Sequence, residues 1–117
     1  MSESNGVVDK SLLLAARNYD TEDVAIAGFG NIRIRPLTRA EVLSHGSAAE
    51  KHGLMHAEAM MIATAVVEPK LSVEDVKRWQ RISAAGEIEP LTDAIMRVSA
   101  MTEEGGREAT DRFPEES

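Results

Sequence analysis

The stretch between Thr21 and Glu41 constrains the fold of this chain most, because it combines two strand patterns with a turn. In segments 22–26 and 32–34, apolar residues occupy alternate positions, which is the period of a strand with two faces. Between them stands Gly-Phe-Gly-Asn, and glycine and asparagine tolerate the positive φ of tight turns. The pattern predicts a β-hairpin over about 22–36, whose buried face consists of Val24, Ile26, Ile32 and Ile34.

A helix is expected to begin directly after the hairpin. Pro36 ends the second strand, because proline has no N–H to donate to a sheet. Thr38 and Glu41 then have the spacing of a capping box, in which each side chain accepts a hydrogen bond from the backbone N–H of the other residue. The hairpin therefore leads straight into a helical remainder of the chain.

Three helical segments are predicted there, over about 39–67, 73–85 and 88–101. The first is expected to be interrupted near Gly46, because glycine inside a helix costs about 1 kcal/mol relative to alanine. From Ala48 to Val67 its residues are apolar on most sides, which is typical of a central helix, and Gly53 is a candidate for a kink or a later start. Ser72, followed by acidic residues, resembles a second N-cap.

The two ends of the chain are expected to differ from this body. Residues 11–16 are a short leucine-rich helix candidate, whose leucines are too clustered to share one face and should dock on the body or on a partner. Residues 102–117 contain six acids and two arginines, a net charge of −4, and are predicted to form a disordered acidic tail. The expected fold is therefore α+β and mostly helical. Over residues 1–101, one globular domain packs an N-terminal helix and a hairpin on three to four helices.

Composition excludes several classes of protein. The chain has 117 residues and no cysteine, so no disulfide framework, thiolate nucleophile or thiolate metal site is available. No apolar run approaches the roughly 20 residues that span a bilayer, and the N-terminus lacks the features of a signal peptide. A cytoplasmic protein is therefore expected. A formal net charge of −7 argues against a general nucleic-acid binder, whose affinity rests on neutralising phosphates.

Candidate catalytic and metal-binding groups are few. His52 and His56 are four residues apart and could share a metal ion, but Glu58 would point away and no third ligand is apparent. The turn at 28–30 has the first two glycines of a nucleotide-binding fingerprint, but Arg33 stands where the third glycine is needed. We therefore expect no metal, no cofactor, no catalytic residue and no enzymatic activity.

Three arginines accompany the hairpin and the start of the following helix. We interpret Arg33, Arg35 and Arg39 as the solvated face of a half-buried strand. A basic patch for a phosphate group or an acidic partner is the alternative interpretation.

The order of these segments resembles that of a known family. The phrases IRIRPLTRAE and VVEPKLSVEDV follow a short leucine-rich segment and an acidic entry to the first strand, and EIEPLTDAIMRVSAM comes after them. Over roughly residues 11–101, this pattern is similar to the tail assembly chaperones of long-tailed siphophages and of related prophage elements.

The resemblance implies a non-enzymatic role. Members of this family coat the long, largely helical tape measure protein before the tail tube polymerises around it, keep it soluble and help to recruit tube subunits. They act in the host cytoplasm, are absent from the mature virion and tend to self-associate. The implied partners are the tape measure protein, the tail tube protein and further copies of the chain. Two alternatives are a virion structural or connector subunit and a small regulatory protein-interaction module such as an antitoxin.

Such a role suggests candidates for the partner-binding surface. A chaperone for an amphipathic helical client needs exposed apolar surface that can repack, and methionine supplies it. Trp79 is the first candidate, because tryptophan is large, often incompletely buried and enriched at binding hot spots. A core anchor is the alternative role for this tryptophan. Met55, Met96 and Met101 are the further partner-binding candidates.

Overall fold

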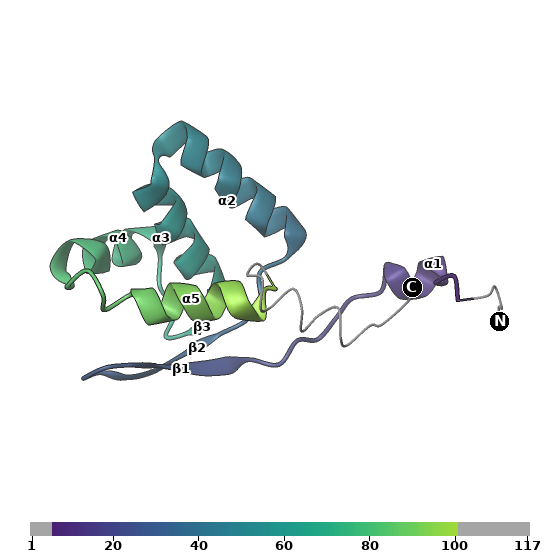
Figure 1. Ribbon diagram of the computed structural model, residues 1–117, viewed down its shortest axis with the longest axis horizontal. Coiled ribbons are helices and arrows are strands. Elements are labelled where there is room, and N and C mark those ends of the chain that lie inside the picture. Colours follow the sequence, from purple (N-terminus) through teal and green to yellow (C-terminus); the bar gives the residue numbers. More distant parts are fainter. Residues whose placement is uncertain (1–5, 101–117) are drawn as a thin grey trace.

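The computed structural model describes residues 6–100, which form an α+β fold of helices on an antiparallel sheet, as the sequence predicts (Figure 1). Met101 and the predicted acidic tail lie outside the described residues. In chain order, the elements within this range are α1 (Lys10–Leu13), β1 (Glu22–Ile26), β2 (Gly30–Ile34), α2 (Arg39–His52), α3 (Leu54–Ala65), β3 (Val66–Glu68), α4 (Val73–Ile82) and α5 (Glu89–Val98).

The hairpin forms as predicted. Strands β1 and β2 pair antiparallel, with Val24 opposite Ile32. Gly28 and Gly30 take φ values of 86° and 126° in the turn, which residues with a Cβ rarely adopt. The expected apolar face points into the core, because three of its four residues are buried and Ile32 packs against them while partly buried.

The third strand, β3, departs from the sequence-based prediction. The helix predicted to reach residue 67 ends at Ala65, and the next three residues pair antiparallel with β2 instead. On the solvent side of the sheet, the guanidinium of Arg33 lies 3.0 Å from the carboxylate of Asp23 and 3.3 Å from that of Glu68. One exposed arginine thus connects all three strands, and its place on the solvated face is as predicted.

The long helix predicted from residue 48 is two helices that meet at Gly53. Helix α2 runs without a break through Gly46, so the interruption predicted there is wrong. Gly53 has a φ of 93° and a ψ of 166°, ends α2 and precedes α3, which confirms the second candidate position. Figure 1 shows the resulting elbow between the two helices.

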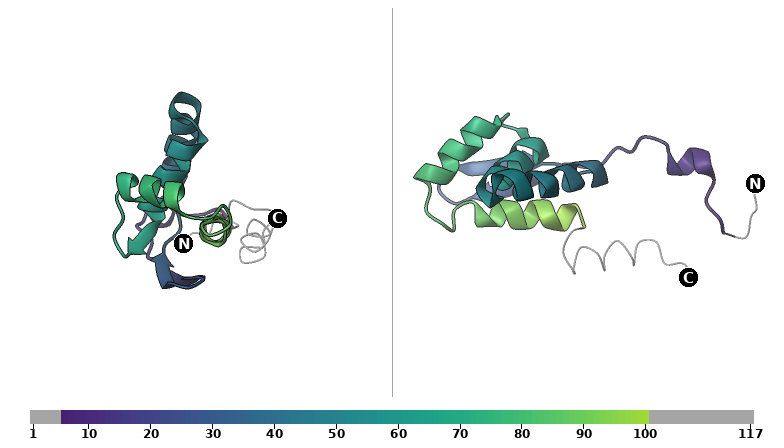
Figure 2. Two further views of the ribbon diagram at one scale, coloured as in Figure 1. Left: turned by 90° about the vertical axis from the view of Figure 1, so that its left-hand side faces the viewer. Right: turned by 90° about the horizontal axis from the view of Figure 1, so that it is seen from above.

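Helix α3 lies at the centre of the core. Its residues Ala59, Ile62 and Ala65 are buried together with residues of the sheet, α4 and α5. These helices all cover the same side of the sheet (Figures 1 and 2). Burying a large aliphatic side chain contributes about 1.5–3 kcal/mol, so the fold rests mainly on this cluster. Its largest fully buried side chains are Ile34, Ile62, Leu91, Ile95 and Val76.

Two capping boxes fix where helices α2 and α4 begin. The Glu41 N–H donates to Thr38 Oγ1 at 3.1 Å, and the Thr38 N–H donates to the Glu41 carboxylate at 2.9 Å. Asp75 and Ser72 exchange the same two bonds at 3.0 and 2.9 Å. The predicted helix starts are therefore confirmed, whereas α4 and α5 each end three residues earlier than predicted.

Helix α5 closes the body against the first strand. The Arg97 guanidinium is paired with the Glu22 carboxylate at the start of β1. The Leu37 N–H donates to Ser99 Oγ at 2.8 Å, which satisfies a backbone donor at the corner between β2 and α2. These two contacts hold the end of α5 against the start of β1 and against the corner between β2 and α2.

Helix α1 stands apart from this body. Its four residues are exposed, and the extended segment before Glu22 carries it away in the direction of β1 (Figures 1 and 2). The side chains of Leu12, Leu13 and Leu14 are 69%, 50% and 70% exposed. The segment therefore does not dock on the body within one chain, and docking on a partner stays a prediction.

Candidate functional site

An apolar groove lies between the tip of the hairpin and helix α4. Its volume is about 410 Å³. Among its lining residues within the described range, Glu87 is the only charged one. The hairpin, the segment after β3 and helix α4 each supply part of the wall. The large apolar residues of this wall are Ile26, Phe29, Ile32, Leu71, Trp79 and Ile82.

Two large side chains on the rim of the groove face water. Phe29, in the hairpin turn, is 78% exposed, and Ile82, the last residue of α4, is 73% exposed. The Phe29 N–H donates to the Ile26 carbonyl at 2.9 Å, which fixes the turn while the ring projects from it. Contiguous exposed apolar surface marks interaction sites, so this groove is the candidate binding site of the body.

Trp79 forms the inner wall of the groove. Its ring is half-buried and packs against the core cluster, and its indole N–H donates to the Glu87 carboxylate at 2.6 Å. The polar end of the ring is therefore satisfied within the protein, and its apolar face is left for the groove. Trp79 thus packs against the core and also lines a hollow on the surface, while its role in partner binding stays a prediction.

A second hollow lies on the other side of α4 and has a more polar lining. Its volume is about 630 Å³, and Leu54 and Met55 are exposed on its wall. The Gln80 side-chain NH₂ group donates to the Met55 carbonyl at 3.0 Å and to the Glu58 carboxylate at 2.9 Å. Glu58, which the sequence placed away from His52 and His56, is half-buried here and accepts a hydrogen bond.

The predicted partner-binding residues do not form one site. Trp79 and Met55 line different hollows, with α4 between them. Met96 is half-buried on α5 and lines neither hollow. Met101 lies outside the described residues. Of the three candidates that the structure describes, only Trp79 lines the apolar groove.

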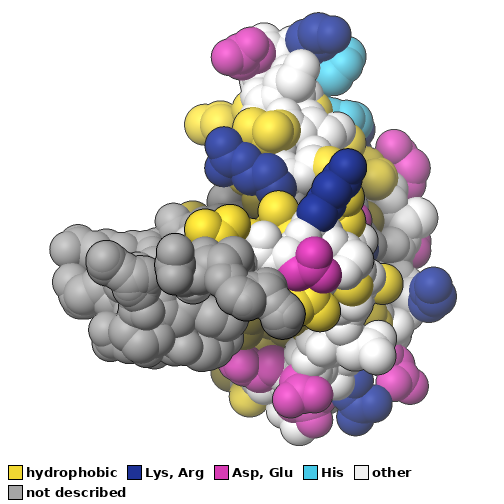
Figure 3. All heavy atoms as spheres, turned by 90° about the vertical axis from the view of Figure 1, so that its right-hand side faces the viewer, with side chains coloured by type: hydrophobic (Ala, Val, Ile, Leu, Met, Phe, Trp, Pro, Cys, Tyr) yellow, Lys and Arg dark blue, Asp and Glu magenta, His cyan; other side chains and the backbone are white. Residues whose placement is uncertain are grey.

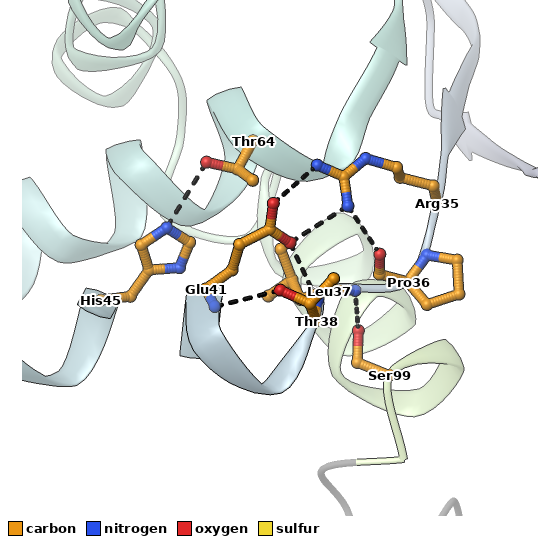
Figure 4. A network of polar contacts seen from close by, with 8 residues as sticks. All are labelled: Arg35, Pro36, Leu37, Thr38, Glu41, His45, Thr64 and Ser99. Atoms are coloured by element: carbon orange, nitrogen blue, oxygen red, sulfur yellow. Dashed lines mark hydrogen bonds and ion pairs between the residues drawn. The ribbon is translucent and has the colours of Figure 1, made fainter. Parts of the chain in front are cut away.

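The three arginines considered from the sequence have three different surroundings. Arg33 is on the open face of the sheet, Arg39 is exposed in the first turn of α2, and Arg35 is partly buried. The prediction of a solvated position is therefore wrong for Arg35. Its guanidinium donates to both carboxylate oxygens of Glu41 at 3.1 and 2.9 Å and to the Pro36 carbonyl at 2.9 Å (Figure 4).

These contacts set the protonation of the corner between β2 and α2. The hydrogen bonds from Arg35 lower the pKa of Glu41 to about 2, and the bond from the Thr38 N–H adds to the effect. Burial lowers the pKa of His45 on the next turn, while the charge of Glu41 opposes this shift. Thr64 Oγ1 lies 3.4 Å from His45 Nε2 (Figure 4). The network joins the end of β2 to the first turn of α2, and its hydrogen bonds occupy both oxygens of the Glu41 carboxylate.

A third hollow, of about 620 Å³, lies where the N-terminal segment leaves the body. Arg17 and Tyr19 of that segment line it together with Arg35 and Arg39. Figure 3, which views the molecule from the end that carries α1, shows basic side chains (dark blue) interspersed with apolar ones (yellow). Of the three arginines considered as a basic patch, Arg35 and Arg39 line this hollow and Arg33 does not, so a basic patch for an acidic partner stays a prediction.

Metal ligands do not gather in the described part of the chain. Across the elbow at Gly53, the ring centroids of His52 and His56 are 5.1 Å apart. Within residues 6–100, no group of three or more histidine, cysteine, aspartate or glutamate residues could hold a metal ion. Among the same residues, no helix has the length and apolarity needed to cross a membrane.

Of the groove residues, the sequence pointed only to Trp79 as a binding residue. The exposure of Phe29 could have been predicted from the sequence, because an aromatic ring in a tight turn between two glycines has few neighbours to bury it. Ile82 had no such signal, since its exposure depends on where α4 ends.

No protein-family model, curated protein or solved structure matches this chain.

Proposed function

We propose that this protein is a phage tail assembly chaperone, which binds the tape measure protein, keeps it soluble and helps to recruit tail tube subunits during tail assembly. The observation that carries the proposal is the apolar groove between the hairpin tip and α4. The two phrases that carry the family resemblance both contribute to it. IRIRPLTRAE supplies Ile32, and VVEPKLSVEDV supplies Pro69 and Leu71.

The groove suits one apolar face of an amphipathic helix. Such helices dock through side chains spaced three or four residues apart, which enter a hydrophobic cleft. Phe29 and Ile82 would close over the two sides of the docked stripe, and Trp79 would form its floor. Glu87 would meet a basic residue beside the stripe. A long helical client would be covered by many copies, each of which binds one short length of it.

This role requires binding and release without catalysis. The protein would act in the host cytoplasm and leave before the virion is complete. Self-association of the chains along the client would present a regular surface to tail tube subunits. These parts of the proposal follow from the family resemblance, whereas the groove supports only the binding of a helical client.

Co-expression with the long helical protein encoded in the same tail gene cluster tests the proposal. Phe29→Ser and Ile82→Ser should each reduce the amount of client captured in a pull-down by about tenfold, since each removes a large apolar contact worth 1 kcal/mol or more. Both side chains are exposed, so the fold should be unaffected. Leu43→Ser is the matched control, because Leu43 is also exposed (57%) but lies on α2.

The outcomes separate the proposal from its alternatives. Equal capture by the groove variants and by the Leu43→Ser control would refute the groove as the client site. Detection of the chain in purified, tailed particles by mass spectrometry would favour a virion structural or connector subunit. Capture of a single regulatory protein in place of the tape measure protein would favour a regulatory interaction module.

A further inference from the structure

We propose that the N-terminal arm of one copy, defined here as residues 6–20, docks into the apolar groove of a second copy. The arm carries α1 and three leucines that are at least half exposed, at positions 12–14. An apolar cluster of this kind is costly to leave in water, because each buried CH₂ group is worth about 0.8 kcal/mol. The groove of the same chain is a second apolar surface that the body leaves uncovered.

The arm and the groove of one chain lie at opposite ends of the molecule. The arm joins the sheet at Glu22, the base of β1, whereas the groove begins at Ile26 and continues past the turn. Figures 1 and 2 show α1 at one end of the long axis and the hairpin tip with α4 at the other. To fill its own groove, the arm would have to reverse direction beside β1. The groove of a second copy can receive the arm without such a reversal.

The charges of the two surfaces also correspond. In sequence, Lys10 and Arg17 flank the three leucines of the arm. The charged residue that lines the groove is Glu87, and one of its carboxylate oxygens accepts the bond from Trp79. Asp9 stands beside Lys10, so Arg17 is the cation that would lie near this carboxylate. The contact is therefore apolar at its centre and has opposite charges at one edge, as in stable protein interfaces.

The size of the contact predicts its symmetry. Three leucines are few compared with the roughly 20–30 residues on each side of a standard interface, so a single docked arm would be weak. Two copies related by a two-fold axis exchange both arms and form the contact twice. We therefore expect a reversible dimer with reciprocal arms.

Arm docking would also regulate the groove. A docked arm occupies the surface on which the client helix is proposed to bind, so client and second copy compete. This regulatory consequence rests on the proposed function, whereas the arm contact itself does not. The competition would cover the groove until a client arrives, which limits non-specific aggregation of its apolar rim.

Because the chain has no cysteine, engineered thiols can test the contact directly. A Leu13→Cys chain with one affinity tag is mixed with an Ile82→Cys chain with another tag and then oxidised. A disulfide requires Cα atoms within about 7 Å, so a mixed disulfide reports docking between copies. Ser47→Cys replaces Ile82→Cys in the control, because Ser47 is exposed on α2. We expect at least fivefold more mixed disulfide with Ile82→Cys, and equal yields would overturn the proposal.

Mass measurements give an independent test. The full chain should be a dimer at high concentration by light scattering, and the variant with Leu12, Leu13 and Leu14 all replaced by serine should be a monomer with an unchanged circular dichroism spectrum. Dimers of equal affinity from both proteins would overturn the proposal. A chain that carries both Leu13→Cys and Ile82→Cys would also overturn it if the disulfide formed mainly within single chains at high dilution.

These experiments need no client, so they succeed or fail separately from the proposed function. Once client binding is established, the triple serine variant should bind the tape measure protein several times more tightly, because no arm competes for the groove. Unchanged client affinity would refute the regulatory part. A mixed disulfide without any client binding would support arm exchange and refute the chaperone role.

Discussion

Arg35 and Glu41 form a bidentate ion pair that joins the end of strand β2 to the first turn of helix α2 (Figure 4). The same carboxylate accepts the Thr38 N–H as part of the capping box. One side chain thus starts the helix and fixes its direction relative to the sheet. Both partners are about one-third exposed, so the pair is partly shielded from water without being fully desolvated.

This pair predicts how stability depends on pH. Because the pKa of Glu41 is about 2 in the folded state and its ordinary value is 4.5, the carboxylate stabilises the fold fully above about pH 4.5. That contribution is lost as the pH falls from about 4.5 to 2. Arg35→Met should cost about 1–2 kcal/mol at pH 7 and flatten the stability curve in this window. Urea denaturation at a series of pH values measures both effects. Arg39→Met, at a neighbouring exposed position, is the control and should leave the slope unchanged.

The two faces of the hairpin should respond in opposite ways to substitution. Ile34 has no exposed surface, so Ile34→Asp would bury an unpaired carboxylate and should cost several kcal/mol. Arg33→Gln on the solvent face removes exposed ion pairs, which are worth roughly 0–1 kcal/mol each. Thermal melting of the two variants makes the comparison. Equal melting temperatures would contradict the described register of the sheet.

Two glycines in helical surroundings should give stability changes of opposite sign. Gly46→Ala should stabilise the protein by about 0.5–1 kcal/mol, because the position is inside α2 and a Cβ there meets nothing within 4 Å. Gly53→Ala should destabilise it by about 1 kcal/mol or more, because the φ of 93° is strained for any residue with a Cβ. Denaturant midpoints decide the matter. Stabilisation by both variants would show that the elbow is not fixed at Gly53.

The acidic segment predicted from the sequence, which lies outside the described residues, should matter for solubility more than for stability. Residues 102–117 have little apolar content to bury, so a chain that ends at Met101 should keep its melting temperature. Removal of a charge of −4 from a total of −7 leaves −3, which weakens repulsion between copies. We expect larger assemblies at low salt by light scattering. A large drop in melting temperature would contradict this prediction.

The features that the sequence predicted correctly are local ones. A capping box needs only a hydroxyl and a carboxylate three residues apart, as at Thr38–Glu41 and Ser72–Asp75, and both formed. The hairpin needs only alternation and a glycine turn, and its four-residue apolar face is correct. These signals act over a few residues, so the rest of the chain does not override them.

The features that the sequence missed depend on distant contacts. Gly46 and Gly53 carry the same local penalty in a helix, and the packing of α3 into the core decides which of them breaks it. Val66 continues an apolar helical pattern, but strand β2, more than 30 residues earlier, offers it a partner. Phe29 and Ile82 became a site only when the hairpin and α4 came together. Tertiary context therefore determined the groove.

The contacts made by α5 and by Ser99, the residue after it, also have a consequence for synthesis of the chain. Arg97 and Glu22 are 75 residues apart, and Ser99 and Leu37 are 62 residues apart. On the ribosome, the hairpin emerges long before α5, so the apolar surface that α5 covers stays open until this helix has left the exit tunnel. The body is therefore completed only late in synthesis, and a pause in translation before α5 would leave an aggregation-prone apolar surface on the nascent chain.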